Sequence, residues 1–155
     1  MELPAASQVV SPSIDLEVDL AAGSRRSTIV CIDDNPANVA LLAALVEDLG
    51  GLELVVAPSA DIGLELIRSH RPSLVVIDVQ LPGMSGFEAL RRLRSAAETR
   101  AIPVIGLASE ASRWDKRRAA RAGFARYLAK PLRVDDLVRA MEELLGRDDT
   151  PPMSR

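Results

Sequence analysis

The stretch that decides the fold is residues 74–86, LVVIDVQLPGMSG, in which four aliphatic residues end at an aspartate and a Pro-Gly pair follows. A short, continuous aliphatic run is typical of a parallel strand that is covered on both faces. Pro82-Gly83 is typical of a turn, and Ser85 followed by Glu88 forms a capping box that predicts the start of a helix. A strand, a turn and a helix in this order make one unit of an α/β fold.

The same unit recurs along the chain, because strand and helix signals alternate five times. The predicted strands are residues 28–32, 53–57, 74–77, 104–107 and 124–128. The segments that follow them have a helical period, and the last carries an apolar stripe at Val134, Leu137, Val138, Met141, Leu144 and Leu145. Five such units predict one doubly wound, five-stranded parallel sheet with right-handed crossovers and helices on both faces.

Charged residues follow three of these strands. Asp33 and Asp34 come after the first, Asp78 after the third and Lys130 after the fifth. In an open α/β sheet the carboxyl ends of the strands line one crevice, so we expect these side chains to meet there. Three carboxylates in one crevice repel one another unless a cation lies among them. Because Mg²⁺ prefers oxygen ligands and retains some waters, the arrangement predicts metal-dependent phosphoryl chemistry on an aspartate.

Length and composition favour one cytoplasmic domain. The chain has 155 residues, enough for a single hydrophobic core, and is 48% hydrophobic with only 3% aromatic residues. It contains no apolar stretch long enough to span a membrane, and residues 1–10 lack the pattern of a signal peptide. Cys31 is the single cysteine, so no internal disulfide is possible. We therefore expect a cytoplasmic location and no membrane contact by this segment.

Both ends of the chain differ in composition from its centre. Residues 1–27 are rich in Pro, Ser and Ala, and residues 14–20 within them alternate apolar and acidic side chains. This alternation fits an added edge strand or a mobile linker, and we predict the linker because an isolated strand has little to hold it. The predicted organisation is a flexible linker at 1–27, a folded domain at 28–146 and a disordered tail at 147–155.

Charge is unevenly distributed along the chain. Residues 91–133 carry a net charge of +9, although the whole chain has a net charge of −3. A basic region of this kind fits solvated helix faces or a surface for acidic partners. Aromatic residues that could stack on bases are few in it, namely Trp114, Phe124 and Tyr127, so we expect no direct nucleic-acid binding.

Four segments resemble the signature regions of response-regulator receiver domains. They are IDDNPAN (32–38), VVIDVQLPGMSGFE (75–88), IPVIGL (102–107) and YLAKP (127–131), and the resemblance covers about residues 28–146. It implies a flavodoxin-like sheet of strand order 2-1-3-4-5 and a role in two-component signalling.

The resemblance also implies roles for individual residues. Asp78 would be the phosphoacceptor, a carboxylate nucleophile that takes a phosphoryl group from a kinase histidine. Asp34, Asp78 and the backbone carbonyl of Gln80 would bind Mg²⁺ directly, and Asp33 through a coordinated water. Lys130 would pair with a phosphoryl oxygen. The implied partner is a histidine kinase or a histidine phosphotransfer domain, and the receiver would catalyse its own phosphorylation without being a turnover enzyme by itself.

Two further expectations follow from the resemblance. The Lys130–Pro131 peptide bond should be cis, as receivers usually have it, which aims the lysine inward. Gln80 and Glu110 lie two positions beyond Asp78 and Ala108, where they would flank the line of water attack and set the lifetime of the phosphoryl group. Ordinary loop polarity is the alternative for both residues.

Ala108 departs from the receiver pattern. Receivers usually place Thr or Ser at this position, where the hydroxyl bonds the phosphoryl group, and alanine has no donor. Ser109 is adjacent, but neighbouring strand residues point to opposite faces, so it could substitute only if the strand end twists. Tyr127 is at the position of the aromatic residue that, in receivers with this Thr or Ser, follows its hydroxyl inward. The alternative is a half-buried ring whose own hydroxyl is in contact with solvent. Ala108 therefore predicts weak coupling between phosphorylation and the output surface.

The wider context has three alternatives. The chain resembles the C-terminal receiver of a hybrid histidine kinase, and ELPAA (2–6) resembles the end of a kinase ATP-binding domain. It also fits a stand-alone, single-domain response regulator. The third alternative is a receiver that binds a protein partner independently of phosphorylation, which Ala108 favours and the full set of three aspartates and Lys130 opposes.

Overall fold

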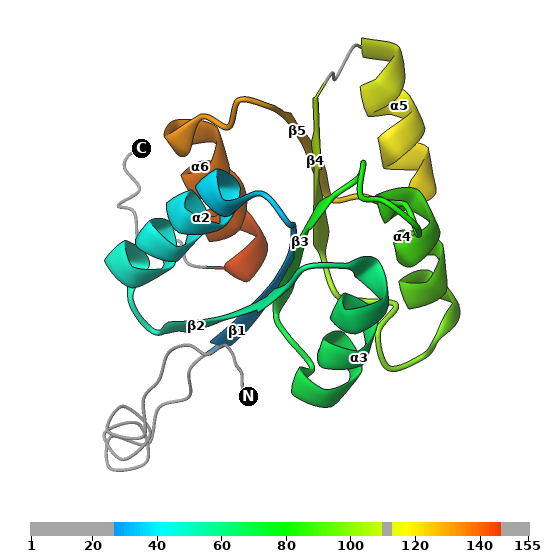
Figure 1. Ribbon diagram of the computed structural model, residues 1–155, viewed down its shortest axis with the longest axis horizontal. Helices are drawn as coiled ribbons and strands as arrows, with labels where there is room; N and C mark the ends of the chain where they lie inside the picture. Colours follow the sequence, from blue (N-terminus) through cyan, green and yellow to red (C-terminus); the bar gives the residue numbers. More distant parts are fainter. Residues whose placement is uncertain (1–26, 110–112, 147–155) are drawn as a thin grey trace.

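The computed structural model describes residues 27–109 and 113–146, in which strands and helices alternate along the chain (Figure 1). The elements in chain order are β1 (Ser27–Ile32), α2 (Pro36–Leu49), β2 (Leu52–Ala57), α3 (Ala60–His70), β3 (Leu74–Asp78), α4 (Gly86–Ser95), β4 (Val104–Ala108), α5 (Arg113–Ala122), β5 (Arg126–Ala129) and α6 (Val134–Leu145). Ser27, which we assigned to the linker, is the first residue of β1. The rest of the predicted linker, the predicted tail and Glu110 lie outside the described residues.

The sheet confirms the predicted fold class. Its five strands are all parallel and lie in the order β2-β1-β3-β4-β5. Helices α2 and α6 cover one face, and α3, α4 and α5 cover the other (Figure 1). Both faces of the central strands are therefore buried, as continuous aliphatic strands require.

Alternation along the strands divides the core into two layers. In β1, Val30 packs in the cluster beneath α3, α4 and α5, whereas Ile29 and Cys31 pack beneath α2 and α6. In β3, Val75 and Val76 divide in the same way. This follows from the two-residue period of a strand, and each fully buried aliphatic side chain contributes roughly 2 kcal/mol of transfer free energy.

Side chains fix the beginnings of three helices. Asn35 Oδ1 accepts a hydrogen bond from Ala37 N at 2.8 Å, and Ser59 Oγ accepts one from Ile62 N at 3.4 Å. Ser85 Oγ accepts from Glu88 N at 3.2 Å, which is the serine side of the predicted capping box. The Glu88 carboxylate accepts instead from two arginines of the same helix, Arg91 and Arg92. These caps pair backbone N–H groups that a helix leaves without intrahelical partners.

The prediction for the last strand was wrong by two residues at its start. We expected residues 124–128, but β5 runs from Arg126 to Ala129. Phe124 N donates to Ala119 O at 3.1 Å, so this residue still belongs to the end of α5 rather than to the ladder. Gly123 has a φ of 113°, a left-handed conformation that favours glycine where a helix ends.

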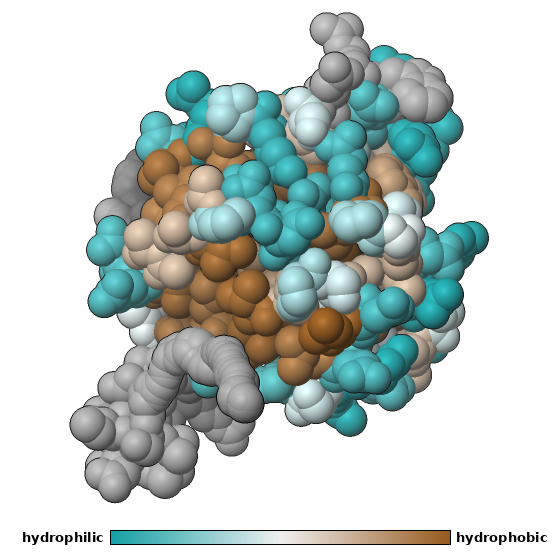
Figure 2. All heavy atoms as spheres, viewed as in Figure 1, coloured by the Kyte–Doolittle hydropathy of each residue, from teal (hydrophilic) through white to brown (hydrophobic). Residues whose placement is uncertain are grey.

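Helix α2 has a largely apolar surface. Its sequence PANVALLAALVEDL places exposed alanines at residues 37, 40, 43 and 44. Figure 2 shows hydrophobic residues gathered over the region of α2 and β2 on this face.

None of the helices within the described residues combines the length and the apolar character that crossing a membrane needs.

Candidate functional site

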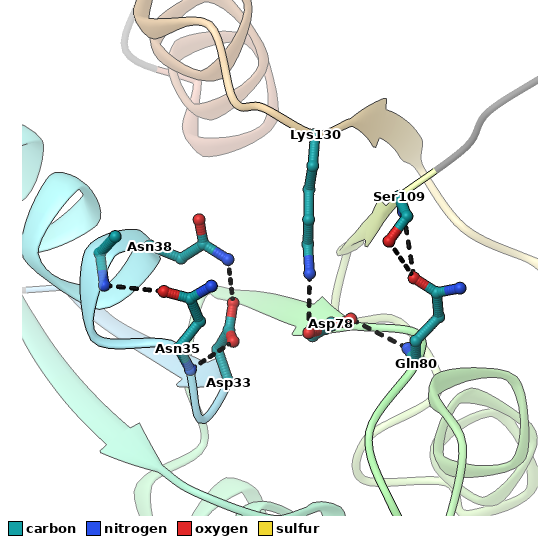
Figure 3. A network of polar contacts seen from close by, with 8 residues as sticks. Asp33, Asn35, Asn38, Asp78, Gln80, Ser109 and Lys130 are labelled. Carbon is teal, nitrogen blue, oxygen red and sulfur yellow. Dashed lines mark hydrogen bonds and ion pairs between the residues drawn. The ribbon is translucent and has the colours of Figure 1, made fainter.

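The carboxyl ends of three strands bring the candidate residues together. Asp33 follows β1, Asp78 is the last residue of β3 and Lys130 follows β5 (Figure 3). Asp33 N donates to Ala57 O at 3.0 Å and Lys130 N donates to Ala108 O at 2.7 Å, so both backbones continue the ladder beyond their strands. The side chains therefore lie at one edge of the sheet because the parallel topology places them there.

The three aspartates form one acidic cluster. Asp33, Asp34 and Asp78 each offer a carboxylate oxygen, and these oxygens lie within 4.8 Å of one another. Asp33 and Asp78 are buried, whereas Asp34 is exposed. Burial raises the pKa of Asp33, and the negative charge of Asp78 adds to this effect. The Asp33 carboxylate thus lies in an environment that opposes its charge, which a cation would offset.

The chemistry of this cluster fits Mg²⁺. All three side chains offer hard oxygen donors, the donor type that Mg²⁺ prefers. The exposed Asp34 places the cluster at the protein surface, where waters can complete an octahedral shell. The residues present therefore suit a magnesium ion that retains part of its hydration.

Two asparagines orient Asp33. Asn35 N donates to Asp33 Oδ1 at 2.9 Å, and Asn38 Nδ2 donates to Asp33 Oδ2 at 3.0 Å. These two hydrogen bonds lower the pKa of Asp33 against the larger effect of burial. Asn38 lies in the first turn of α2, and sequence reasoning missed its role. Its spacing of five residues from Asp33 was the available signal, because a side chain in the first helical turn faces the preceding loop.

Both oxygens of the Asp78 carboxylate have partners. Lys130 Nζ lies 2.9 Å from Oδ2, and Gln80 N donates to Oδ1 at 2.9 Å. The Asp78 and Lys130 side chains are 8% and 20% exposed, so the pair is largely removed from solvent. A pair this buried needs such hydrogen bonds to offset the desolvation of its charges. The Lys130–Pro131 peptide bond is cis, as expected.

Gln80 connects Asp78 with Ser109. The Gln80 Oε1 atom accepts hydrogen bonds from Ser109 N at 3.1 Å and from Ser109 Oγ at 2.6 Å (Figure 3). Strand β4 ends at Ala108, so Ser109 lies beyond the strand and the alternation of a pleated strand does not fix its direction. Ala108 itself is buried and has no donor. The Gln80–Ser109 contact was not anticipated from the sequence.

Tyr127 lies in a small group of aromatic rings. Its ring centroid is 5.6 Å from that of Phe124 and 6.2 Å from that of Phe87. Burial raises the pKa of the Tyr127 phenol; the charge of Asp115 adds to this effect and that of Arg118 opposes it. The ring is half-buried in the structure, and both expectations for Tyr127 stay predictions.

Comparison with known sequences identifies the family. The sequence model described as the response regulator receiver domain matches residues 29–142. The polar-differentiation response regulator DivK of Brucella anthropi is 33% identical over 119 residues, which cover 77% of this chain and 96% of DivK. The sensor protein GacS of Pseudomonas syringae pv. syringae is 30% identical over 146 residues, which cover 92% of this chain but only 16% of GacS.

Solved structures agree with this result. The receiver domain of the sensor histidine kinase PA1611 from Pseudomonas aeruginosa PAO1 superposes with a TM-score of 0.69 and 26% sequence identity, covering 78% of this chain and 98% of that domain. That structure contains a magnesium ion coordinated in the active-site cleft. Sheet order, the acidic cluster at the strand ends and the sequence match together lead to one conclusion: this chain belongs to the response regulator receiver domains of two-component signalling.

Proposed function

We propose that this chain is a phosphoacceptor that receives a phosphoryl group on Asp78 from a phosphohistidine of a histidine kinase or histidine phosphotransfer domain. A carboxylate oxygen of Asp78 attacks phosphorus, the phosphorus–nitrogen bond breaks and the imidazole leaves with the bond electrons. The product is an acyl phosphate on Asp78. The observation that carries this proposal is the Lys130–Asp78 ion pair at 2.9 Å beside the cluster of three carboxylates.

The acidic residues supply the metal site in this proposal. Asp34, Asp78 and the Gln80 carbonyl would hold Mg²⁺ directly and Asp33 through a water; the bound ion supplies charge neutralisation for the phosphoryl oxygens. Asn35 and Asn38 keep the Asp33 carboxylate in one orientation. The chain thus contributes a site formed before the phosphodonor arrives, which suits a reaction limited by positioning and charge.

Lys130 and the Gln80 backbone act on the Asp78 carboxylate itself. Lys130 Nζ is bound to Oδ2 and Gln80 N to Oδ1, so the carboxylate is held in a fixed plane. After transfer, the ammonium of Lys130 would move to a phosphoryl oxygen, because a compact charge on a flexible stem follows the stronger negative charge. The function assigned to Lys130 therefore needs a short movement of one side chain only.

For context, we propose a receiver that begins at Ser27, the first residue of β1, and is attached through a linker at 1–26 to a hybrid histidine kinase in the cytoplasm. The alignment with GacS supports this context because it spans 146 residues, more than the 119 residues aligned with DivK. The match to nearly the full length of DivK supports the alternative of a stand-alone regulator. Ala108 supports a second candidate function, the binding of a protein partner without phosphorylation.

Phosphotransfer tests the proposal. A phosphorylated histidine phosphotransfer domain is mixed with the wild-type chain, with Asp78→Asn and with Asp34→Asn, in the presence and absence of Mg²⁺. We expect rapid loss of label from the histidine donor only with the wild-type chain and Mg²⁺. Two results together would replace this proposal with the phosphorylation-independent function. Neither a phosphohistidine protein nor a small phosphoryl donor would label the chain, and a protein partner would bind it equally well with and without beryllofluoride.

A further inference from the structure

The contact between Gln80 and Ser109 joins the loop after β3 to the loop after β4. One acceptor atom, Gln80 Oε1, takes both the N–H and the O–H donor of a single residue, at 3.1 and 2.6 Å. Both distances fall in the range of well-formed hydrogen bonds. Two donors that converge on one oxygen form a small site for an oxygen acceptor, and the glutamine oxygen fills it.

The position of Gln80 links this small site to the phosphoacceptor. Gln80 N donates to Asp78 Oδ1 at 2.9 Å, while its side chain extends to Ser109. In Figure 3 the Gln80 and Ser109 side chains lie on the opposite side of Asp78 from Asp33 and Asn38. A single residue therefore joins the carboxylate that would be phosphorylated to the hydroxyl nearest the end of β4.

Ala108 makes this hydroxyl important. The end of β4 offers no side-chain donor at residue 108, which is buried and apolar. Ser109, directly after it, has a hydroxyl and a backbone N–H that face the same direction, toward Gln80. A phosphoryl oxygen carries negative charge and accepts stronger hydrogen bonds than a neutral carboxamide oxygen does. It can therefore displace the glutamine oxygen from these two donors.

We propose that Ser109 donates its hydroxyl and N–H to the phosphoryl group on Asp78, and that Gln80 is a placeholder that occupies both donors until the phosphoryl group arrives. This inference rests on the proposed phosphorylation of Asp78. Gln80 acts on phosphoryl binding through Ser109 and is a positioning residue. Exchange of the acceptor needs rotation of the Gln80 side chain, while its backbone N–H remains on Asp78.

The two residues predict a specific non-additivity. In the wild-type chain, Ser109→Ala removes the hydroxyl from the phosphoryl group but also removes a bond to Gln80 that must be broken before the phosphoryl group binds. These two effects partly cancel. In a Gln80→Met background the competing acceptor is gone, so Ser109→Ala removes only the favourable bond. The loss caused by Ser109→Ala is therefore larger in Gln80→Met than in the wild-type chain.

Beryllofluoride with Mg²⁺ is the probe, and its affinity is measured by ¹⁵N NMR titration of the full chain. We expect Gln80→Met to tighten binding by about three-fold, the scale of one or two weak neutral hydrogen bonds. Ser109→Ala should weaken binding by about three-fold alone and by about ten-fold in Gln80→Met. The amide resonance of residue 109 should shift on titration in every variant that binds, because its N–H gains fluoride as an acceptor, in place of the Gln80 oxygen where Gln80 is present.

Control variants separate this inference from the function on which it rests. Ser95→Ala removes a serine hydroxyl that donates to Arg92 O on α4, and it should leave beryllofluoride affinity unchanged. If Ser109→Ala changes nothing in either background while Asp78→Asn abolishes binding, the placeholder is refuted and the phosphoacceptor function stands. If the wild-type chain itself binds no beryllofluoride, both are refuted.

Discussion

Lys130 Nζ lies 2.9 Å from Asp78 Oδ2, although 52 residues separate the two in sequence. Asp78 ends β3 and Lys130 follows β5, and β4 lies between these strands in the sheet. Two strand spacings amount to roughly 10 Å, so the lysine side chain must extend across the end of β4 to reach the carboxylate. Lys130 therefore covers the end of β4, where the phosphoryl group would lie.

Replacing Lys130 should separate phosphoryl binding from metal binding. Lys130→Met keeps the length of the stem and removes the charge. We expect beryllofluoride affinity to fall by more than about ten-fold, because a charge-assisted contact is lost. Mg²⁺ affinity should stay equal or increase, since a positive charge has left the carboxylates. Titrations of both ligands check this, and an equal loss of both affinities would contradict the assignment.

Asp33 and Asp34 should respond differently to neutralisation. Asp33→Asn removes a negative charge from a site where burial raises the pKa of the carboxyl, and it also removes the acceptor of one of the hydrogen bonds from Asn35 N and Asn38 Nδ2. Without Mg²⁺ we expect the loss of the charge to have the larger effect, so the free energy of unfolding should increase, by up to about 1 kcal/mol. Asp34→Asn, at an exposed position, should leave it nearly unchanged. Both substitutions should reduce Mg²⁺ affinity. Urea denaturation and Mg²⁺ titration measure these effects, and a less stable Asp33→Asn would show that charge is tolerated at this position.

Tyr127 should titrate above the ordinary value for a phenol. Burial raises its pKa, so the folded state holds the phenol proton more tightly than the unfolded chain does. The associated stability is fully present below the unfolded pKa, about 10, and is lost as the pH rises through the folded pKa. Tyr127 is the single tyrosine, so phenolate absorbance reports it directly. In denaturant, the pH midpoint of the phenolate titration should fall to the ordinary value. The same midpoint in the folded and the denatured chain would contradict the prediction.

Arg94 should be important for stability rather than for phosphorylation. Its guanidinium donates to Arg100 O at 3.0 Å, Ile102 O at 2.9 Å and Gly123 O at 2.9 Å, and burial lowers its pKa. Arg94→Met leaves these carbonyls without that donor. We therefore expect the free energy of unfolding, measured by urea denaturation, to fall by about 2–3 kcal/mol. Arg91→Met is the matched control, because the Arg91 side chain is 73% exposed. Equal stabilities of the two variants would refute this role.

The sequence predicts the sheet well because two strong patterns agree. Continuous aliphatic runs mark strands that are buried on both faces, and the parallel topology then brings Asp33, Asp34, Asp78 and Lys130 to one edge. Periodicity predicts the strands, whereas the strand order was implied by the resemblance to receiver domains. The start of β5 was less predictable, because the Phe124 N–H bonds to the end of α5 and its apolar side chain resembles that of a strand residue.

Single polar contacts had no comparable pattern. Three sets of hydrogen bonds depend on how loops and helix ends are placed in space. They are the bonds of Asn38 to Asp33, of Ser109 to Gln80 and of Arg94 to three backbone carbonyls. Each of these residues is a polar side chain of a type common on surfaces, and its partner is fixed only after the chain folds. Ser109 illustrates this, since strand alternation ceased to apply one residue beyond the end of β4.

The most direct test of the central claim is to locate the phosphoryl group chemically. The chain is incubated with Mg²⁺ and a small phosphoryl donor such as acetyl phosphate, and the acyl phosphate is then reduced with borohydride, which converts the modified aspartate to homoserine. Mass spectrometry identifies the reduced residue, with Asp78→Asn as the control. The account predicts homoserine at position 78 in the wild-type chain and none in the variant. Absence of homoserine, or its appearance at another aspartate, would contradict it.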